Sequence, residues 1–263
     1  MSAGQYEAAL TDENHSSDEH TGHQRYLRNI LSLGYGFGPH WNGFLDLPYE
    51  YRVQRVNEES PHHQNETLSA PGDVHLRINY LWKNRVFGPG WRLYSGAGLI
   101  LPTGSAYESN VFAPEADSVF HSHMVSGLGN YQFSMQGEAY YRSNFPVATG
   151  LVVNGRFPLW NPETAYSPGI EWSVLWTNYL HAIQVFSSVP RFNILVSGRT
   201  AESWSGDQWP NSGGWKFDIQ GGWTTEISEF WAALFEVNIP VWQNYRGTQL
   251  SGVHATVTVR YLF

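Results

Sequence analysis

The sequence predicts an all-β fold: a transmembrane, antiparallel up-and-down β-barrel of about twelve strands. Three observations support this prediction. Apolar and polar residues alternate along many segments of about 10–14 residues, which is the period of a strand with two different faces. Aromatic residues make up 16% of the chain, including 12 Trp, and Trp and Tyr suit the two membrane interfaces. The chain has no apolar run of the roughly 18 residues that a transmembrane helix needs.

The C-terminal segment shows the alternation most clearly. One face carries Val253, Ala255, Val257, Val259, Tyr261 and Phe263, whereas the other carries His254, Thr256, Thr258 and Arg260. A strand that ends on an aromatic residue, with another aromatic two residues earlier, is typical of bacterial outer-membrane barrels. We therefore expect the protein to lie in the bacterial outer membrane, where lipid demands that every backbone polar group is paired and a β-sheet must close on itself.

The same alternation predicts the other strands in order along the chain. In 73–83, for example, Val74, Leu76 and Ile78 oppose His75 and Arg77. The predicted strands are 5–10, 26–37, 41–55, 73–83, 91–102, 131–142, 147–158, 170–181, 191–200, 215–226, 230–242 and 253–263. A soluble β-sandwich also alternates, but its strands usually have only about 5–6 residues. The strand length favours the membrane barrel.

Aromatic residues and connection lengths indicate how the strands cross the bilayer. Six Trp residues lie near segment ends, as interfacial girdles require: Trp41, Trp82, Trp91, Trp215, Trp231 and Trp242. Short turns alternate with longer polar connections at 57–72, 103–124, 159–168, 201–214 and 243–251. We expect short turns and both termini on the periplasmic side. Residues 1–263 are predicted to form one barrel domain, and 1–25 to hold the first strand and a His-rich outer loop.

Composition and motifs argue against several classes of function. A net charge of −8 and an isoelectric point near 5.7 disfavour nucleic acid as a partner. The chain has no Cys, so it has no disulfide or thiolate metal site. His121-Ser122-His123 is the only close Ser/His arrangement in the long loops, and we find no nucleotide-binding or nucleophile-elbow motif. We expect no enzymatic activity and no cofactor.

The polar faces of the strands predict which residues line the lumen. The candidate pore-lining residues are Asp46, Glu50, Arg52, His75, Arg77, Glu138, Arg142, Arg156, Glu171, Arg199, Lys216, Asp218, Glu236 and His254. Such a mixture of charges could hold water and a solute path. Alternatively, the charges could pair with one another and plug a narrow barrel. Twelve strands lie between filled eight-stranded barrels and open 16-stranded porins, so size does not decide between these alternatives.

Histidines are concentrated in the predicted outer loops. They are His15, His20, His23, His62, His63, His121 and His123. Clustered imidazoles and carboxylates can bind Zn(II), Cu(II) or Ni(II), which would make the protein a metal-binding pore. The spacing fits no fixed metal template, so ordinary solvated loops are the alternative.

Four stretches resemble a known family. Gly98-Leu-Ile-Leu-Pro-Thr-Gly-Ser105 resembles a Gly-Leu-Lys-Leu-Pro-Thr-Gly-Asp element of outer-membrane barrels assigned to meta-pathway phenol degradation, or described as transporter-like. Further similar stretches are Ser126-Gly-Leu-Gly-Asn130, Asn211-Ser-Gly-Gly-Trp215, and 238–250. Ser105 and Gly221-Gly222 depart from the family pattern, and residues 1–70 do not match it.

The resemblance implies an outer-membrane channel for passive uptake of small, hydrophobic or aromatic compounds. The partners would be membrane lipid and lipopolysaccharide, a small-molecule solute, and the barrel-assembly machinery, which would bind the C-terminal strand. A structural barrel with a closed lumen is the main alternative.

Overall fold

The computed structural model describes residues 5–13, 22–56, 65–85, 88–104, 126–144, 147–160, 166–181, 188–204, 207–208, 212–246 and 251–261. The main sheet holds 13 antiparallel strands, of which the short β4 (Glu66–Pro71) pairs only with one half of β3 (Trp41–Val56). The other twelve follow one another around a ring. The ring is closed because β1 pairs with β16 and β2 pairs with β3.

The twelve ring strands confirm the predicted fold class. They are β1 (Gln5–Glu13), β2 (Gly22–Gly36), β3, β5 (Val74–Asn84), β6 (Gly90–Leu101), β7 (Tyr131–Arg142), β8 (Val147–Trp160), β10 (Glu171–Leu180), β11 (Ser188–Arg199), β14 (Gly214–Glu226), β15 (Trp231–Tyr245) and β16 (His254–Tyr261). Each predicted strand corresponds to one of them, with ends that differ by a few residues. Leu262 and Phe263 lie outside the described residues.

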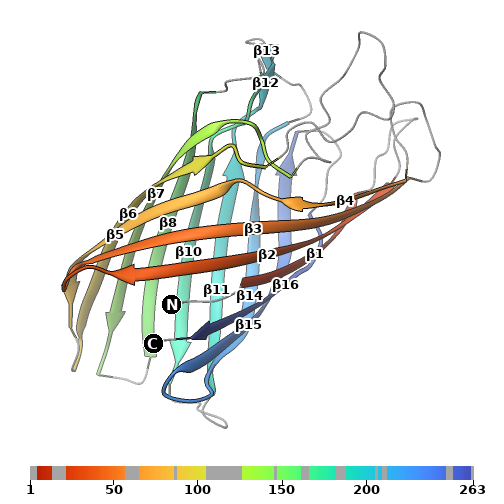
Figure 1. Ribbon diagram of the computed structural model, residues 1–263. Helices are drawn as coiled ribbons and strands as arrows, with labels where there is room; N and C mark the ends of the chain where they lie inside the picture. The colour runs from red at the N-terminus through yellow and green to blue at the C-terminus, as the bar shows by residue number, and fades with distance from the viewer. Residues whose placement is uncertain are drawn as a thin grey trace.

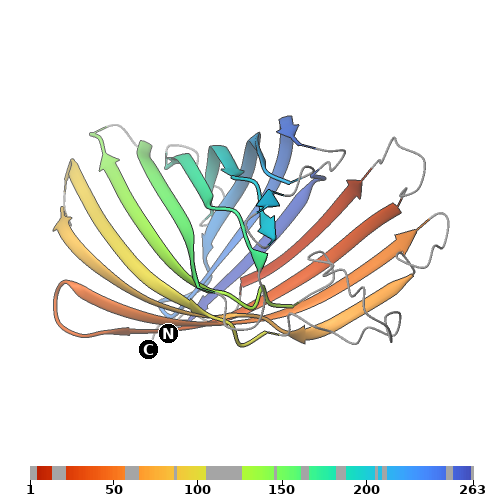
Figure 2. The ribbon, with the colours of Figure 1, turned by 90° about the horizontal axis from the view of Figure 1, so that it is seen from above.

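The connections place the two ends of the barrel. Tight turns at 37–40 and 227–230 join β2 to β3 and β14 to β15. In Figure 1 these turns lie at the lower end, which we call the short-turn end, and we call the opposite end the outer end. Seen from above in Figure 2, the strands form a continuous curved wall.

Three very short strands at the outer end were not predicted. β9 (Tyr166–Ser167), β12 (Ser203–Trp204) and β13 (Asp207–Gln208) pair into a small separate sheet. Each has only two residues, which is too short to show an alternation in the sequence. β4 has only six residues, fewer than a strand needs to cross a membrane, and it lies within the predicted connection 57–72.

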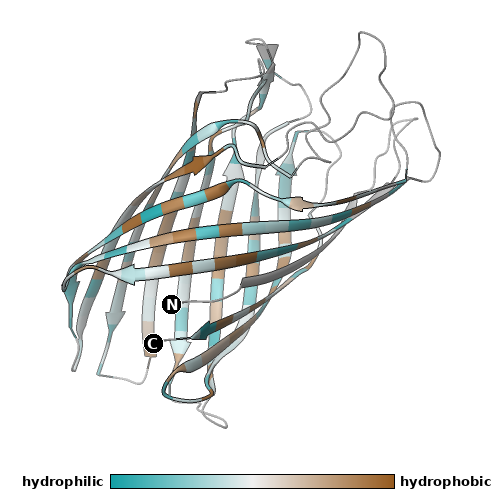
Figure 3. Cartoon of the chain, in the orientation of Figure 1, coloured by the Kyte–Doolittle hydropathy of each residue, from teal (hydrophilic) through white to brown (hydrophobic). Residues whose placement is uncertain are grey.

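Polar side chains are buried and apolar side chains are exposed, which is the reverse of the arrangement in a soluble protein. Among the described residues, the buried side chains are mainly polar, and they include Asp46, Thr177, Asn193 and Asp218. Large apolar side chains lie exposed on the outer wall, and Figure 3 shows apolar and polar positions alternating along each strand. The soluble sandwich is excluded by this pattern, because its apolar face would point inward.

Aromatic contacts form the two expected girdles on the outer wall. All six predicted Trp residues are exposed, between 41% for Trp215 and 66% for Trp82. Near the short-turn end, ring centroids of Trp41 and Trp82 each lie 4.7 Å from that of Tyr80. Near the outer end, Trp215 and Trp242 are 4.1 Å apart. Among the described residues, no helix is long and apolar enough to cross a membrane.

Candidate functional site

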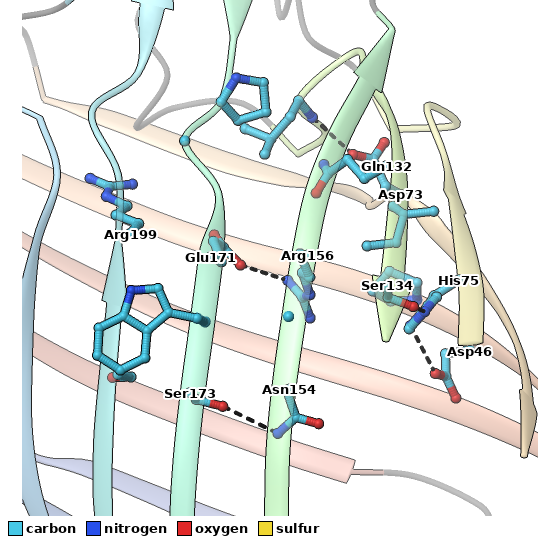
Figure 4. Close-up of a pocket in the computed structure, with 18 of the residues that line it drawn as sticks. Asp46, Asp73, His75, Gln132, Ser134, Asn154, Arg156, Glu171, Ser173 and Arg199 are labelled. Carbon is cyan, nitrogen blue, oxygen red and sulfur yellow. Dashed lines mark hydrogen bonds and ion pairs between the residues drawn. The ribbon is translucent and has the colours of Figure 1, made fainter. Parts of the chain in front are cut away.

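A cavity of about 920 Å³ occupies the interior of the barrel toward its outer end. Its wall comes from β2, β3, β5, β6, β7, β8, β10, β11 and the end of β15, and from the connecting segments at 73, 126–128, 166–169, 202 and 251. Figure 4 shows polar side chains from neighbouring strands pointing into this space. They point inward because successive side chains of a strand alternate between its two faces.

Ion pairs cover one part of the cavity wall, on β2, β3 and β5. The Arg77 guanidinium donates hydrogen bonds to both carboxylate oxygens of Asp46, at 2.8 and 3.1 Å. The Glu50 carboxylate accepts from Arg52 at 2.9 Å and lies 3.5 Å from Arg28. Because these carboxylates are nearly buried and fully paired, this part of the wall is a fixed network of alternating charges.

A second pair on the cavity wall is much more open. Arg156 Nη1 lies 3.2 Å from Glu171 Oε2, and the two side chains are 42% and 44% exposed. Farther round the wall, Arg199 Nη1 lies 2.9 Å from Glu202 Oε1. A charged solute in the cavity could therefore exchange contacts with Arg156 and Glu171 at little cost, since exposed pairs bind one another weakly.

The outer rim of the cavity is tied together by Asp73. Its carboxylate accepts one hydrogen bond from the Gly104 N–H at 3.0 Å and another from the Leu128 N–H at 2.9 Å. Burial raises the pKa of Asp73 despite these two hydrogen bonds. Two of the stretches that carry the family resemblance, 98–105 and 126–130, thus meet at one carboxylate, which gives them a shared structural role.

Tyr166 lies beside this rim on β9. Its backbone oxygen accepts a hydrogen bond of 3.1 Å from the Asn130 side chain. Burial, reinforced by the negative charge of Glu202, raises the pKa of the Tyr166 phenol above its ordinary value. The Tyr166 phenol therefore stays neutral. The hydrogen bond from Asn130 to the Tyr166 backbone oxygen holds 126–130 against the small sheet at the outer end.

Away from the cavity, the lumen is filled by a group that we call the packed cluster: Thr177, Arg191, Asn193, Gln220 and Glu236. The Asn193 amide donates to Gln220 at 3.0 Å and to Glu236 at 2.8 Å. Arg191 Nε donates to Thr177 at 3.1 Å, and Arg191 Nη1 lies 3.4 Å from Glu236. Thr177 and Asn193 have no exposed surface. Water therefore cannot reach these two side chains.

A third polar group joins β14, β15 and β16. Lys216 Nζ lies 3.0 Å from the fully buried Asp218 carboxylate, which also accepts from Asn238 at 3.2 Å. Lys216 reaches Ser251 at 3.2 Å, and the Ser251 hydroxyl lies 2.8 Å from His254 Nε2. These groups extend the packed side of the lumen toward the outer end.

The structure divides the predicted pore-lining residues into three groups. Those that line the cavity are Asp46, Glu50, Arg52, His75, Arg77, Arg156, Glu171 and Arg199. Glu236, Lys216, Asp218 and His254 lie in the packed regions instead. Glu138 accepts a hydrogen bond of 2.6 Å from Gln136 farther along β7, and Arg142 is exposed at the end of that strand.

Four residues of the cavity or the packed cluster were not predicted from the sequence: Arg28, Ser134, Arg191 and Asn193. Alternation along the strand could have identified some of them, because residues separated by an even number of positions lie on the same face. Arg191 and Asn193 share the parity of Arg199, which was assigned to the lumen. Asp73 begins the predicted strand 73–83 on the same face as His75 and Arg77, so alternation could have identified it as well.

The metal hypothesis falls almost wholly outside the described residues. This holds for His15, His20, His62, His63, His121 and His123, and of His23 only the backbone is described. Within the described part of the chain, no group of three or more His, Cys, Asp or Glu residues could hold a metal ion.

Comparison with known proteins shows the fold. Neither a protein-family description nor a curated relative matches the chain. An outer membrane channel from Pseudomonas putida F1 has a similar structure, with a TM-score of 0.69 and 10% identity over 98% of this chain and 93% of that one. The NanC porin is also similar, with a TM-score of 0.53 and 9% identity over 99% of both chains. The chain thus has the barrel fold of solved channel and porin structures.

Proposed function

We propose that the protein is a bacterial outer-membrane channel through which small solutes diffuse passively. The observation that carries this proposal is a closed ring of twelve strands with a polar, hollow interior and an apolar exterior. Lipid stabilises the apolar wall and its aromatic girdles, whereas the polar wall can hydrate a solute. The similar fold of an outer membrane channel supports the same location and activity.

The chemistry of the cavity wall favours small polar or charged solutes. The family resemblance implies hydrophobic or aromatic solutes, and the many aromatic residues supported that expectation. However, exposed aromatics such as Trp41, Trp82 and Trp223 belong to the outer wall, where they face lipid. The cavity presents mainly Arg, Asp, Glu, Ser and amide groups, although Tyr26, Tyr166, Trp172 and Tyr245 also line it. An apolar solute gains little there, because it would displace water without replacing its hydrogen bonds.

A closed-lumen structural barrel is the second candidate, and the packed cluster favours it. Thr177, Asn193 and Asp218 have no exposed surface, so part of the cross-section is filled. If the filled part spans the lumen, the cavity is a blind pocket open at one end only. Transport and structural roles therefore differ in one measurable property, which is conductance.

Planar-bilayer recording and liposome swelling test the proposal together. The protein, refolded in lipid, is expected to give discrete conductance steps in KCl and to admit glycine and small organic ions faster than a disaccharide. Uptake of a radiolabelled aromatic compound by cells with and without the gene tests the hydrophobic alternative. Absence of both conductance and swelling would favour the structural barrel, and uptake of the aromatic compound alone would favour the route implied by the resemblance.

A further inference from the structure

Three side chains on the cavity wall meet in an arrangement that neither channel nor structural roles require. Ser134 Oγ on β7 lies 2.7 Å from His75 Nε2 on β5. On the other side of the imidazole, His75 Nδ1 lies 3.5 Å from Asp46 Oδ2 on β3. All three residues line the cavity, and Figure 4 shows them next to one another. The order hydroxyl, imidazole, carboxylate is that of nucleophilic hydrolases.

A missing side chain on β6 allows this arrangement. β5 and β7 are not neighbours, because β6 lies between them and pairs with both. Gly98 is opposite Arg77 on one side and Ser134 on the other. A Cβ atom at Gly98 would lie 2.6 Å from Ser134 Oγ and 2.7 Å from His75 Nε2. Only glycine leaves room for the imidazole to cross β6 and reach the hydroxyl.

The carboxylate is fixed by partners of its own. Asp46 accepts from Ser32 Oγ at 2.7 Å and from Arg77 at 2.8 and 3.1 Å, so its position does not depend on His75. A carboxylate beside Nδ1 favours the tautomer that carries its proton there. Nε2 is then the unprotonated nitrogen, and its lone pair can accept the hydroxyl proton of Ser134.

A positive charge lies next to the hydroxyl as well. Arg156 on β8 is the direct cross-strand partner of Ser134, so the two residues are neighbours on the inward face. Its pairing with Glu171 uses one terminal nitrogen and leaves the side chain 42% exposed. The remaining N–H groups can stabilise negative charge that develops on a carbonyl oxygen attacked by Ser134.

We propose that the cavity contains an ester-hydrolysing site in which Ser134 is the nucleophile, His75 the general base and Asp46 the residue that positions His75. This goes beyond channel function and beyond the sequence-based expectation that the protein is not an enzyme. The substrate class is short-chain carboxylic esters, since a polar cavity of about 920 Å³ suits a small polar molecule better than a long acyl chain. The ester needs to reach Ser134 from the cavity, but it does not need to pass through the barrel.

The reaction balances with water as the only co-reactant. Ser134 Oγ attacks the carbonyl carbon as its proton passes to His75 Nε2. The bond from that carbon to the alkoxy oxygen breaks, the alcohol leaves with the proton, and the acyl group remains on Ser134. Water then attacks the acyl carbon and gives a proton to His75, which returns it to Ser134 Oγ as the carboxylic acid departs.

Activity-based labelling tests the nucleophile directly. The folded protein in detergent is treated with a fluorophosphonate probe, and the labelled peptide is identified by mass spectrometry. We expect the label on Ser134 and its loss in S134A. S173A is the matched control, because Ser173 also lines the cavity but is hydrogen-bonded by Asn154 at 3.2 Å. Labelling that is absent, or that falls on Ser251 beside His254, would overturn the proposal.

Hydrolysis of p-nitrophenyl acetate tests the rest of the site. H75Q is expected to lower kcat by about 100-fold, because general-base catalysis is lost. D46N should lower kcat with little change in KM and shift the pH profile, whereas a merely structural Asp46 would leave the profile unchanged. G98A should lower the rate by separating His75 from Ser134.

Two measurements separate loss of the site from loss of the fold. Heat-modifiable gel migration shows whether each variant is folded, and S134C reports access, since a thiol in the cavity should react with a small methanethiosulfonate reagent. Equal hydrolysis by the unaltered protein and folded S134A, or an S134C thiol that does not react, would overturn the proposal. Conductance of the unaltered protein is recorded separately from ester hydrolysis, so failure of the ester-hydrolysing site and failure of the channel are distinguishable.

Discussion

The cavity wall and the packed cluster are built from the same kinds of residue but differ in exposure. On the cavity wall, Arg156 and Glu171 are 42% and 44% exposed although they pair at 3.2 Å. In the packed cluster, Arg191 and Glu236 pair at 3.4 Å and are only 12% and 15% exposed. Charge content alone therefore does not decide whether part of a lumen is open or filled.

The difference arises from what surrounds each pair. Around Glu236, the side chains of Asn193, Gln220 and Thr177 interlock by hydrogen bonds and exclude water. Beside the cavity, by contrast, the Arg156–Glu171 pair borders an open volume of about 920 Å³. The consequence is energetic, because a buried charge that loses its partner costs far more than an exposed one.

The largest effect is expected for D218A on the packed side. Lys216 is 14% exposed and would keep its charge without its carboxylate partner, so we expect a loss of about 3–5 kcal/mol of stability. Urea unfolding in lipid vesicles measures it. D218N, which keeps the shape but removes the charge, serves as a control. A loss below about 1 kcal/mol would show that this side of the lumen is hydrated.

The double variant R191A/E236A tests whether the packed cluster limits flow. Removing both partners avoids leaving one unpaired charge and opens space beside Asn193, so single-channel conductance should rise by about twofold or more. The matched control is R156A/E171A, which removes a pair from the open wall and should change conductance less. Equal changes in the two double variants would contradict the comparison.

The rim of the cavity should respond to pH through Asp73. Its pKa is raised in the folded protein because of burial, so the folded state binds a proton more tightly than the unfolded state does. The stabilisation is complete below the unfolded pKa of about 4 and is lost as pH rises through the folded pKa. The midpoint of heat-induced unfolding should fall over this range, and D73N should flatten the dependence. A midpoint that rises with pH would disprove it.

The smallest effect on stability is expected for E171A. The Arg156–Glu171 pair is nearly half exposed, so the loss should stay within about 1 kcal/mol. Selectivity should nevertheless shift toward anions, because Arg156 then faces the cavity without a counter-charge. Reversal potentials in a KCl gradient measure the shift. A large loss of stability with unchanged selectivity would mean that this pair is structural, like those of the packed cluster.

Much of the fold could be predicted because lipid imposes a strict local rule. Every second residue of a membrane strand faces lipid, so segments such as 73–83 and 131–142 show their orientation in the sequence itself. The six Trp residues of the girdles were identified on the same ground, and all are exposed. The short strands at the outer end have two residues each, too few to show an alternation, and they were missed.

The sequence by itself determined the twelve strands of the ring and the alternation of their two faces, because alternation is a property of neighbouring positions. It did not determine which inward side chains lie at the same height, since that depends on the register between strands. His75 and Ser134 are 59 positions apart, and they meet only because Gly98 lies between them in the sheet. The packed cluster likewise joins Thr177 to Arg191 and Asn193 to Glu236 across separate strands. Only the tertiary structure, through strand register and the space that each side chain leaves, decided where the lumen is open and where it is filled.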